Sequence, residues 1–276
     1  MDRLISALAV LTICVGPAWA DMPEMATISY WQPQDYAKIP AGGIALVNLQ
    51  DGFLDAPPAT IDLYRGVIAG ATARGVQILV YVPTGYGERD PARENEGGTM
   101  GQSMDMIHAQ IDGYVDAYGA ENLLGIFFDE TSQSCASAAT DYAALSAYVR
   151  AKGLAVSVWN PGWVGDNYCY VNATPAGDII VTFESDLNTY SSDEYLAVDL
   201  PESERIATER GVQTWHLIHT AQGDDGLKVA LDLLRVRGPD YAYVTDRQDW
   251  MIEDTWGGPP SYWPAELACL QDQVCP

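Results

Sequence analysis

Two kinds of segment, distinguished by their pattern of hydrophobic and polar positions, alternate along the chain from Ala26 onward. Short apolar runs of strand length recur, and several of the stretches between them carry apolar residues at helical spacing. The expected strands are Ala26–Trp31, Gly43–Leu49, Val76–Pro83, Leu123–Glu130, Leu154–Asn160, Asp178–Glu184, Val212–Ile218 and Tyr241–Thr245. Strands that alternate with helices indicate βαβ units, and therefore a parallel sheet.

Four of the expected helices have a clear apolar stripe and an end signal. Ser103 and Thr140 precede two of them as capping residues, and a glycine follows each helix. The stripes are Leu63, Val67, Ile68 and Ala71; Ile107, Ile111, Tyr114, Val115 and Tyr118; Tyr142, Leu145, Tyr148 and Val149; and Leu227, Ala230, Leu231 and Leu234. The stretch from Tyr30 to Gly42 is too short for a full helix.

About eight strand–helix pairs in roughly 250 residues predict a single α/β domain folded as a (β/α)₈ TIM barrel. An open doubly wound sheet fits less well, and no G-x-G-x-x-G follows the first strand, so a dinucleotide-binding version has no support. The length of 276 residues, with 48% hydrophobic and 19% charged residues, is typical of a globular protein.

Residues 1–20 have the pattern of a signal peptide. Arg3 precedes an apolar run from Leu4 to Val15, and Ala18-Trp19-Ala20 supplies a small-x-small cleavage pattern. We therefore expect residues 21–276 to form one exported domain, secreted or periplasmic. No later apolar run is long enough to span a bilayer, and we expect a monomer.

Cleavage would remove Cys14 and leave four cysteines, which allow three pairings. We favour Cys135–Cys169, which would tie two neighbouring loops, and Cys269–Cys275, which would pin the C-terminal tail. A zinc site is the rival interpretation, but the spacings contain no C-x-x-C pair.

The formal net charge of −24, from 38 acidic and 14 basic residues, argues against a nucleic-acid partner. It permits a cationic substrate, such as a partly deacetylated amino-sugar polymer, because the field of the protein attracts it at long range. Acidic surfaces are also common in secreted and salt-adapted proteins, so the charge alone does not identify a substrate.

In a barrel of this kind the active site lies at the C-terminal ends of the strands. The residues found there are Tyr30, Trp31, Asn48, Tyr81, Thr84, Tyr86, Asp129, Glu130, Asn160, Glu184, His216, His219 and Asp246. Carboxylates carry out acid–base and nucleophilic steps in glycoside hydrolysis, and aromatic faces stack on sugar rings. Candidate platforms are Trp31, Trp159, Trp163, Trp215, Trp250, Trp256 and Trp263.

Neither a metal nor a cofactor is expected at these strand ends. His216 and His219 are three residues apart, so at strand period they face opposite sides. A hydrogen-bonding histidine is therefore favoured over a metal ligand. Asp224-Asp225-Gly226 lacks the rest of a calcium loop, and helix capping explains it better.

An ordered set of motifs resembles the spherulation-specific family 4 (spherulin-4-like) glycoside hydrolases. The motifs are Val82-Pro83-Thr84-Gly85-Tyr86-Gly87, Gly125-Ile126-Phe127-Phe128-Asp129-Glu130, Asn160-Pro161-Gly162, Thr182-Phe183-Glu184, Tyr241-Ala242-Tyr243-Val244-Thr245-Asp246 and Pro260-Ser261-Tyr262-Trp263. The resemblance covers nearly the whole mature chain. It implies a (β/α)₈ barrel and an endo-acting hydrolase of α-1,4-linked galactosamine or N-acetylgalactosamine polymers in microbial exopolysaccharide.

The chain departs from this family in two places. Asn48-Leu49-Gln50-Asp51-Gly52 stands where members usually carry an asparagine-proline-x-x-glycine-proline segment. The insert Asp90–Gln102 is long and charged, and we interpret it as a disordered tip rather than a lid. These differences bear on the polymer that is recognised more than on the chemistry.

The resemblance implies Asp129 as the nucleophile and Glu184 as the general acid/base, with Glu130 orienting Asp129 or a sugar hydroxyl. Adjacent residues of a strand point to opposite sides, so Asp129 and Glu130 are not expected to face the same place. A carboxylate separation near 5 Å would give retention of configuration and about 6.5–9.5 Å inversion, and we expect retention. The remaining strand-end residues, Tyr30, Trp31, Asn48, Tyr81, Thr84, Tyr86, Asn160, His216 and Asp246, are expected to bind substrate.

Two other functions fit the same residues. A non-catalytic polysaccharide-binding barrel would keep the aromatic groove without needing two facing carboxylates. A metal-dependent polysaccharide deacetylase would need a cluster of two histidines and an aspartate, which the histidine spacing does not favour.

Overall fold

The structure is a computed structural model that describes residues 22–95, 98–132, 134–162, 168–192, 198–271 and 274–275. The expected signal peptide, residues 1–20, and the candidate platform Trp163 lie outside these residues. None of the described helices is both long and apolar enough to cross a membrane.

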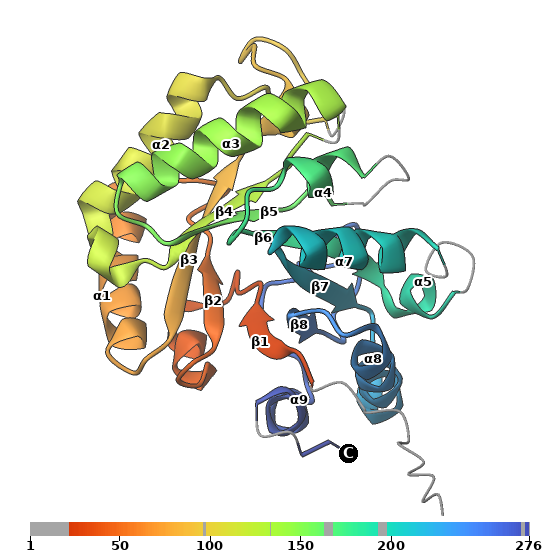
Figure 1. Cartoon of the computed structure of the whole chain (residues 1–276). Helices are drawn as coiled ribbons and strands as arrows, with labels where there is room; N and C mark the ends of the chain where they lie inside the picture. The colour runs from red at the N-terminus through yellow and green to blue at the C-terminus, as the bar shows by residue number, and fades with distance from the viewer. Residues whose placement is uncertain are drawn as a thin grey trace, which may run out of the picture.

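Eight parallel strands form a closed barrel within the described residues (Figure 1). They are β1 (Glu24–Thr27), β2 (Ile44–Val47), β3 (Gln77–Pro83), β4 (Gly125–Asp129), β5 (Val156–Trp159), β6 (Ile179–Asp186), β7 (Gln213–His219) and β8 (Tyr241–Val244). Neighbours in sequence pair side by side, and β1 pairs with β8 to close the barrel. The predicted (β/α)₈ architecture is confirmed.

Helices surround the barrel and cover its outer face (Figure 1). They are α1 (Pro58–Thr72), α2 (Met104–Tyr118), α3 (Cys135–Ala151), α4 (Cys169–Ala173), α5 (Leu187–Ser191), α7 (Asp199–Arg210), α8 (Gly223–Arg237) and α9 (Trp263–Leu270). The short 3₁₀ turns η1 (Pro33–Lys38), η2 (Gly85–Gly87) and η3 (Ala120–Asn122) complete the connections. The connection after β1 holds only the turn η1, as its length predicted.

Two details of the helices differ from the sequence prediction. In α1 the core position expected at Leu63 is wrong, because Leu63 is 54% exposed and Tyr64 is buried beside Ile68 instead. The helix α3 begins at Cys135, before the capping signal at Thr140. Ser103, in contrast, caps α2 as predicted, because its side chain accepts a hydrogen bond from a backbone N–H in the first turn.

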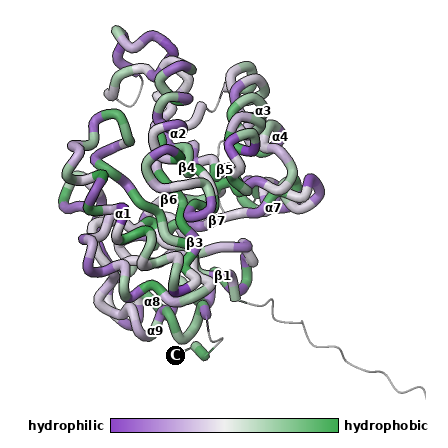
Figure 2. Tube along the Cα trace, turned by 90° about the vertical axis from the view of Figure 1, so that its left-hand side faces the viewer, coloured by the Kyte–Doolittle hydropathy of each residue, from purple (hydrophilic) through white to green (hydrophobic). Residues whose placement is uncertain are grey.

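The barrel strands are the hydrophobic centre of the molecule (Figure 2). Within a strand, neighbours point to opposite sides. Phe127 faces the barrel interior and meets Trp215 edge-on at 5.7 Å. Phe128 faces outward and stacks on Trp159, which in turn stacks on Tyr142 of α3 at 4.1 Å. Aromatic contacts therefore fill the barrel and join it to its helices.

The first strand is shorter than predicted, ending at Thr27 rather than Trp31. Side-chain hydroxyls continue the pairing toward β2: Thr27 donates to the Ile44 carbonyl at 3.0 Å, and Ser29 donates to the Leu46 carbonyl at 2.9 Å. Hydroxyl side chains thus contact β2 up to Ser29, and Trp31 lies beyond the strand.

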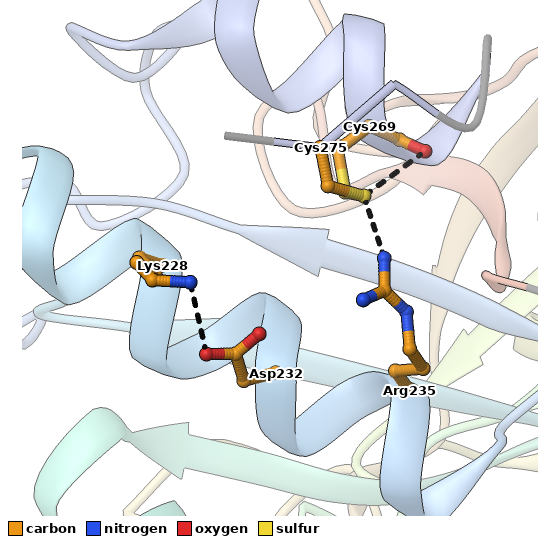
Figure 3. Close-up of a disulfide and its surroundings, with 5 residues drawn as sticks. All are labelled: Lys228, Asp232, Arg235, Cys269 and Cys275. Carbon is orange, nitrogen blue, oxygen red and sulfur yellow. Dashed lines mark hydrogen bonds and ion pairs between the residues drawn. A yellow bond between two sulfur atoms is a disulfide. The ribbon is translucent and has the colours of Figure 1, made fainter. Parts of the chain in front are cut away.

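Both predicted disulfides are present, Cys135–Cys169 and Cys269–Cys275. The first joins the beginnings of α3 and α4. The second fastens the C-terminal tail to α9, where Arg235 of α8 lies 3.0 Å from the Cys275 sulfur (Figure 3). The favoured pairing among the three possibilities is therefore confirmed.

Candidate active site

Three polar side chains from adjacent strands meet at the C-terminal mouth of the barrel. Asp129 ends β4, Asn160 follows β5 and Glu184 lies in β6. The Asn160 side-chain nitrogen donates to Asp129 Oδ1 at 2.8 Å and to Glu184 Oε2 at 2.7 Å. The two carboxyl oxygens therefore cannot be farther apart than the sum of these two distances. One amide therefore holds two carboxyl groups as a pair.

Strand alternation places the first two members of this set. Phe127 faces the interior, so Asp129, two residues later, also faces inward. Trp159 faces α3, so the next residue, Asn160, turns toward the barrel mouth.

Glu184 reaches the mouth through an irregularity in β6. Val181 pairs with the inward-facing Trp215, and Glu184 pairs with Leu217, two residues further along β7. Three steps along β6 therefore match two along β7, which makes Thr182 the extra residue of a β-bulge. In a regular strand Glu184 would take the opposite side from Val181. The bulge thus turns the Glu184 carboxyl into the barrel.

The carboxyl pair lies in a cavity of about 560 Å³, a volume suited to a small ligand. Its described lining consists of Ile28, Tyr30, Asp51, Asp55, Tyr81, Pro83, Thr99, Met100, Gln102, Phe127, Asp129, Glu130, Asn160, Glu184, Trp250 and Trp256. This lining contains five carboxyl groups and aromatic rings but no lysine, arginine or histidine. The site is therefore strongly acidic.

Burial and mutual repulsion set the charge of the pair. Burial, reinforced by the nearby Asp129 charge, raises the pKa of Glu184 to about 7, although hydrogen bonds from Asn160 and the Trp256 indole oppose the shift. Burial also raises the pKa of Asp129, but a backbone N–H, Tyr81 and Asn160 all donate to it and favour its ionised form. These environments therefore favour the protonated form at Glu184 more than at Asp129.

Asp129 and Glu130 both line the cavity, so the expectation that they face different places is wrong. Glu130 is not extended: its φ is 53°, and strand alternation stops at Asp129. Thr84 holds this conformation, because its hydroxyl donates to the Glu130 carbonyl at 2.8 Å while the Tyr86 N–H donates to the same carbonyl. The Glu130 carboxylate accepts from Thr99 at 3.1 Å.

Two expected substrate-binding residues lie away from the cavity, which corrects their predicted placement. Trp31 is 1% exposed and packs edge-on against Trp263 at 5.1 Å. His216 is fully buried on the outer side of β7, where Tyr190 and Glu204 contact its two ring nitrogens. Alternation explains His216, since the preceding residue of β7 faces inward.

Three further candidates do not line the cavity. Asn48 contacts Asp51 through both its side-chain oxygen, at 2.8 Å, and its nitrogen, so it holds a residue that does line the site. Asp246 accepts from the Ser261 hydroxyl at 2.5 Å. Tyr86 lines a neighbouring polar cavity of about 580 Å³. Of the predicted residues, only Tyr30, Tyr81, Asp129, Glu130, Asn160 and Glu184 line the carboxyl cavity.

Asp51 and Asp55, which were not among the predicted site residues, add two carboxyl groups to the cavity lining. Gln50 and Asp51 have φ values of 60° and 61°, so the chain turns sharply after β2 and directs the loop to the mouth. The available signal was position, because Asp51 is the second residue after the predicted strand Gly43–Leu49.

The insert Asp90–Gln102 also reaches the cavity, which sequence reasoning did not predict. Outside residues 96 and 97, its described part contains a β-bridge between Glu94 and Met100. Thr99, Met100 and Gln102 line the mouth. The interpretation of this segment as a disordered tip is therefore wrong for the described residues.

Of the candidate tryptophan platforms, two line the cavity and four are buried in the core. Trp256 is 9% exposed and contacts Glu184, whereas Trp250 is 77% exposed at the rim. The buried ones are Trp31, Trp159, Trp215 and Trp263. Among the residues described, no cluster of three or more potential metal ligands occurs. The site thus offers a bridged pair of carboxyl groups beside aromatic side chains.

Comparisons with known proteins agree with this architecture. The family model described as "Spherulation-specific family 4" matches residues 29–270. The crystal structure of Aspergillus clavatus Sph3 in complex with GalNAc is similar with a TM-score of 0.63 and 19% identity, over 91% of this chain and 98% of that one. A search of curated protein sequences found no match.

The barrel is also shared with more distant enzymes. A modular endo-beta-1,4-mannanase of glycoside hydrolase family 26 from Cellulomonas fimi has a TM-score of 0.51 and 15% identity, over 92% of this chain and 69% of that chain. Malate synthase from Haloferax volcanii has a TM-score of 0.52 and 10% identity, over 82% and 71%. Likeness at these identities shows the fold alone, because one barrel supports many chemistries.

Proposed function

Because the chain belongs to spherulation-specific family 4, we propose that it is an endo-acting glycoside hydrolase of an amino-sugar polymer. The observation that carries the proposal is the pair Asp129 and Glu184, bridged by the Asn160 amide in a cavity where burial and the Asp129 charge raise the pKa of Glu184. Glycoside hydrolysis requires one protonated and one ionised carboxyl group across the scissile bond. The short spacing imposed by the bridge supports retention of configuration rather than inversion.

In the proposed mechanism the Asp129 carboxylate attacks the anomeric carbon while Glu184 gives its proton to the glycosidic oxygen. The C–O bond breaks, the leaving chain departs as an alcohol, and a glycosyl ester forms on Asp129. Glu184, now ionised, takes a proton from water, which attacks the same carbon and releases Asp129. Asn160 donates to both carboxyl groups and so fixes their positions through both steps.

The acidic lining supports a polymer of α-1,4-linked galactosamine or N-acetylgalactosamine. Free amino groups are cationic, and a cavity whose described lining has five carboxyl groups and no basic residue attracts them. The GalNAc bound to Sph3 is an amino sugar of the same class. The two disulfides support export to an oxidising compartment, and we propose secretion or the periplasm, action on microbial exopolysaccharide, and a monomer.

Incubation with a panel of purified exopolysaccharides tests this proposal, with new reducing ends and product masses as the readout. Release of oligosaccharides from galactosamine-rich polymer is the expected result. Binding without new reducing ends would favour the non-catalytic binding protein instead. Release of acetate that is abolished by a chelator would favour the deacetylase.

The pH dependence of kcat/KM is expected to be bell-shaped, with its upper limb near pH 7. Glu184 must be protonated to donate, so activity falls as pH rises through its pKa of about 7. The lower limb reports protonation of Asp129, whose pKa is also raised. Initial rates measured from about pH 4 to about pH 9 check this. A kcat/KM that stays constant above pH 7 would contradict the role of Glu184.

Trp250→Ala is expected to raise KM for long polymer about tenfold, which corresponds to about 1.4 kcal/mol. Trp250 lines the cavity, and Trp250, Met251 and Ile252 are each at least 68% exposed, an unusual run of exposed apolar residues. Cleavage of a short aryl glycoside, which cannot reach the rim, should not change. Val236→Ala, at an exposed position of α8, is the control. Equal losses on both substrates would count against a rim subsite.

A further inference from the structure

The β-bulge that turns Glu184 into the cavity is tied to a buried polar cluster outside the barrel. The Thr182 hydroxyl donates to Glu204 Oε1 at 2.5 Å. The same oxygen lies 2.9 Å from His216 Nε2, and the other ring nitrogen of His216 lies 2.7 Å from the Tyr190 hydroxyl. One carboxylate of α7 therefore contacts both the extra residue of β6 and the neighbouring strand β7.

The cluster is enclosed by its surroundings. Thr182 is 1% exposed and His216 is fully buried. The Tyr190 ring packs against Phe183 at 4.5 Å, and the Arg237 guanidinium of α8 lies 3.9 Å over its other side. Helices α5, α7 and α8 thus hold the outer face of β6 at the level of the bulge.

The packing of Phe183 depends on the register of β6. In the bulged strand both Thr182 and Phe183 face outward, and Glu184 faces inward. A β6 without the bulge would place successive residues on alternate sides, so Thr182 and Glu184 would both face outward. Phe183 would then occupy the inward position beside Leu217. The outward packing of Phe183 against Tyr190 and His216 therefore exists only in the bulged register, which is also the register that turns Glu184 into the cavity.

We propose that Thr182, Glu204 and His216 form a clamp that positions Glu184 for proton transfer. The proposal rests on the glycoside hydrolase function proposed above. No member of the clamp lines the cavity, so the three act through β6 and are positioning residues. Thr182 faces outward with or without the bulge, so the contacts that distinguish the two registers are those of Phe183 with Tyr190 and His216. The Thr182 hydroxyl, the 15% exposed Glu204 side chain and the buried His216 imidazole satisfy one another and so hold the extra residue at the outer face of β6, next to Phe183.

The test compares Thr182→Val, which removes the hydroxyl at nearly constant shape, with Thr182→Ser, which keeps it. Thr182→Val is expected to lower kcat by about tenfold to a hundredfold, because displacement of a catalytic group by about 1 Å has this effect. KM for the polymer should stay within about twofold of wild type. The upper limb of the pH profile should move to lower pH, since Glu184 would lose burial and the raising effect of Asp129. Thr182→Ser should restore both quantities.

A second pair of variants tests the clamp from α7. Glu204→Ala should reproduce the loss, whereas Glu209→Ala, at an exposed position of the same helix, should not. Wild-type kcat and pH profile in both Thr182→Val and Glu204→Ala would overturn the proposal. Failure of both variants to fold would also overturn it, because the cluster would then be a requirement of the fold.

A readout without activity separates this inference from the proposed function. Crystal structures of wild type and Thr182→Val show whether the contact of Asn160 with Glu184, 2.7 Å here, is kept. Its loss in the variant supports the clamp even if no polymer is hydrolysed by wild type, a result that would defeat the proposed function alone. An unchanged contact would overturn the clamp.

Discussion

Asp129→Asn and Glu184→Gln are each expected to lower kcat on the amino-sugar polymer by a factor of at least about 10³, with the fold intact. An amide at position 129 cannot form the glycosyl ester, and an amide at position 184 has no proton of suitable acidity to give to the leaving oxygen. Asn160 can still contact either amide oxygen, so the geometry should change little. New reducing ends per unit time are the measurement.

The thermal stability of these variants provides the control. The pKa of Glu184 in the fold, about 7, is above its value in the unfolded chain, so the unfolded state holds the ionised form more easily. The carboxyl group therefore destabilises the fold increasingly as pH rises from the unfolded pKa toward about 7. Glu184→Gln should have an equal or higher Tm at neutral pH. A loss of activity that coincides with a lower Tm would not support a catalytic role.

Glu130→Gln is the matched comparison within the same cavity. Glu130 contacts Thr99 rather than Asn160. Among the described contacts, no single donor bridges Glu130 to a second carboxyl group. We expect at most about a tenfold loss in kcat. If Glu130→Gln were as inactive as Asp129→Asn, the assignment of nucleophile between these neighbours would be wrong.

The sequence predicts the barrel well because each strand can be recognised from its own residues. Strands such as β3 and β4 are buried on both faces, so each is a continuous apolar run whose end is marked by a polar residue. The C-terminal ends of the parallel strands lie at one mouth of the barrel. This rule predicts from the sequence that Asp129, Asn160 and Glu184 lie close together. Ordered motifs across the chain then indicated the family.

The remaining site could not be predicted because it depends on departures from regular geometry. The left-handed φ of Glu130 and the bulge at Thr182 each reverse the side that alternation assigns. His216 follows alternation, but its outward orientation becomes evident only from its contacts with Tyr190 of α5 and Glu204 of α7. Loop residues such as Asp55 and Thr99 reach the cavity through long connections whose paths no periodic pattern describes.

A second strong effect is expected at the opposite end of the barrel, where Asp178 precedes β6. This carboxylate is fully buried and accepts four hydrogen bonds. The donors are Ser146 at 2.7 Å, Arg150 at 2.8 Å, the Ser157 N–H at 3.2 Å and the Trp159 indole at 3.2 Å. Asp178 therefore joins β5, β6 and α3 below the site, at the barrel end associated with stability rather than catalysis.

Asp178→Ala is expected to lower the free energy of unfolding by about 3 kcal/mol and Tm by about 10 °C. The value is at the low end for a broken buried ion pair because Arg150 is 39% exposed and can be hydrated, whereas the Ser157 N–H and the Trp159 indole cannot. Asp62→Ala, which breaks an exposed pair on α1, should change stability by less than about 0.5 kcal/mol. Chemical denaturation measures the free energy of unfolding of both variants. The kcat of the folded Asp178→Ala protein should stay near wild type, because none of the four residues that donate to Asp178 lines the cavity. A large kcat loss with unchanged stability would contradict this separation of the two barrel ends.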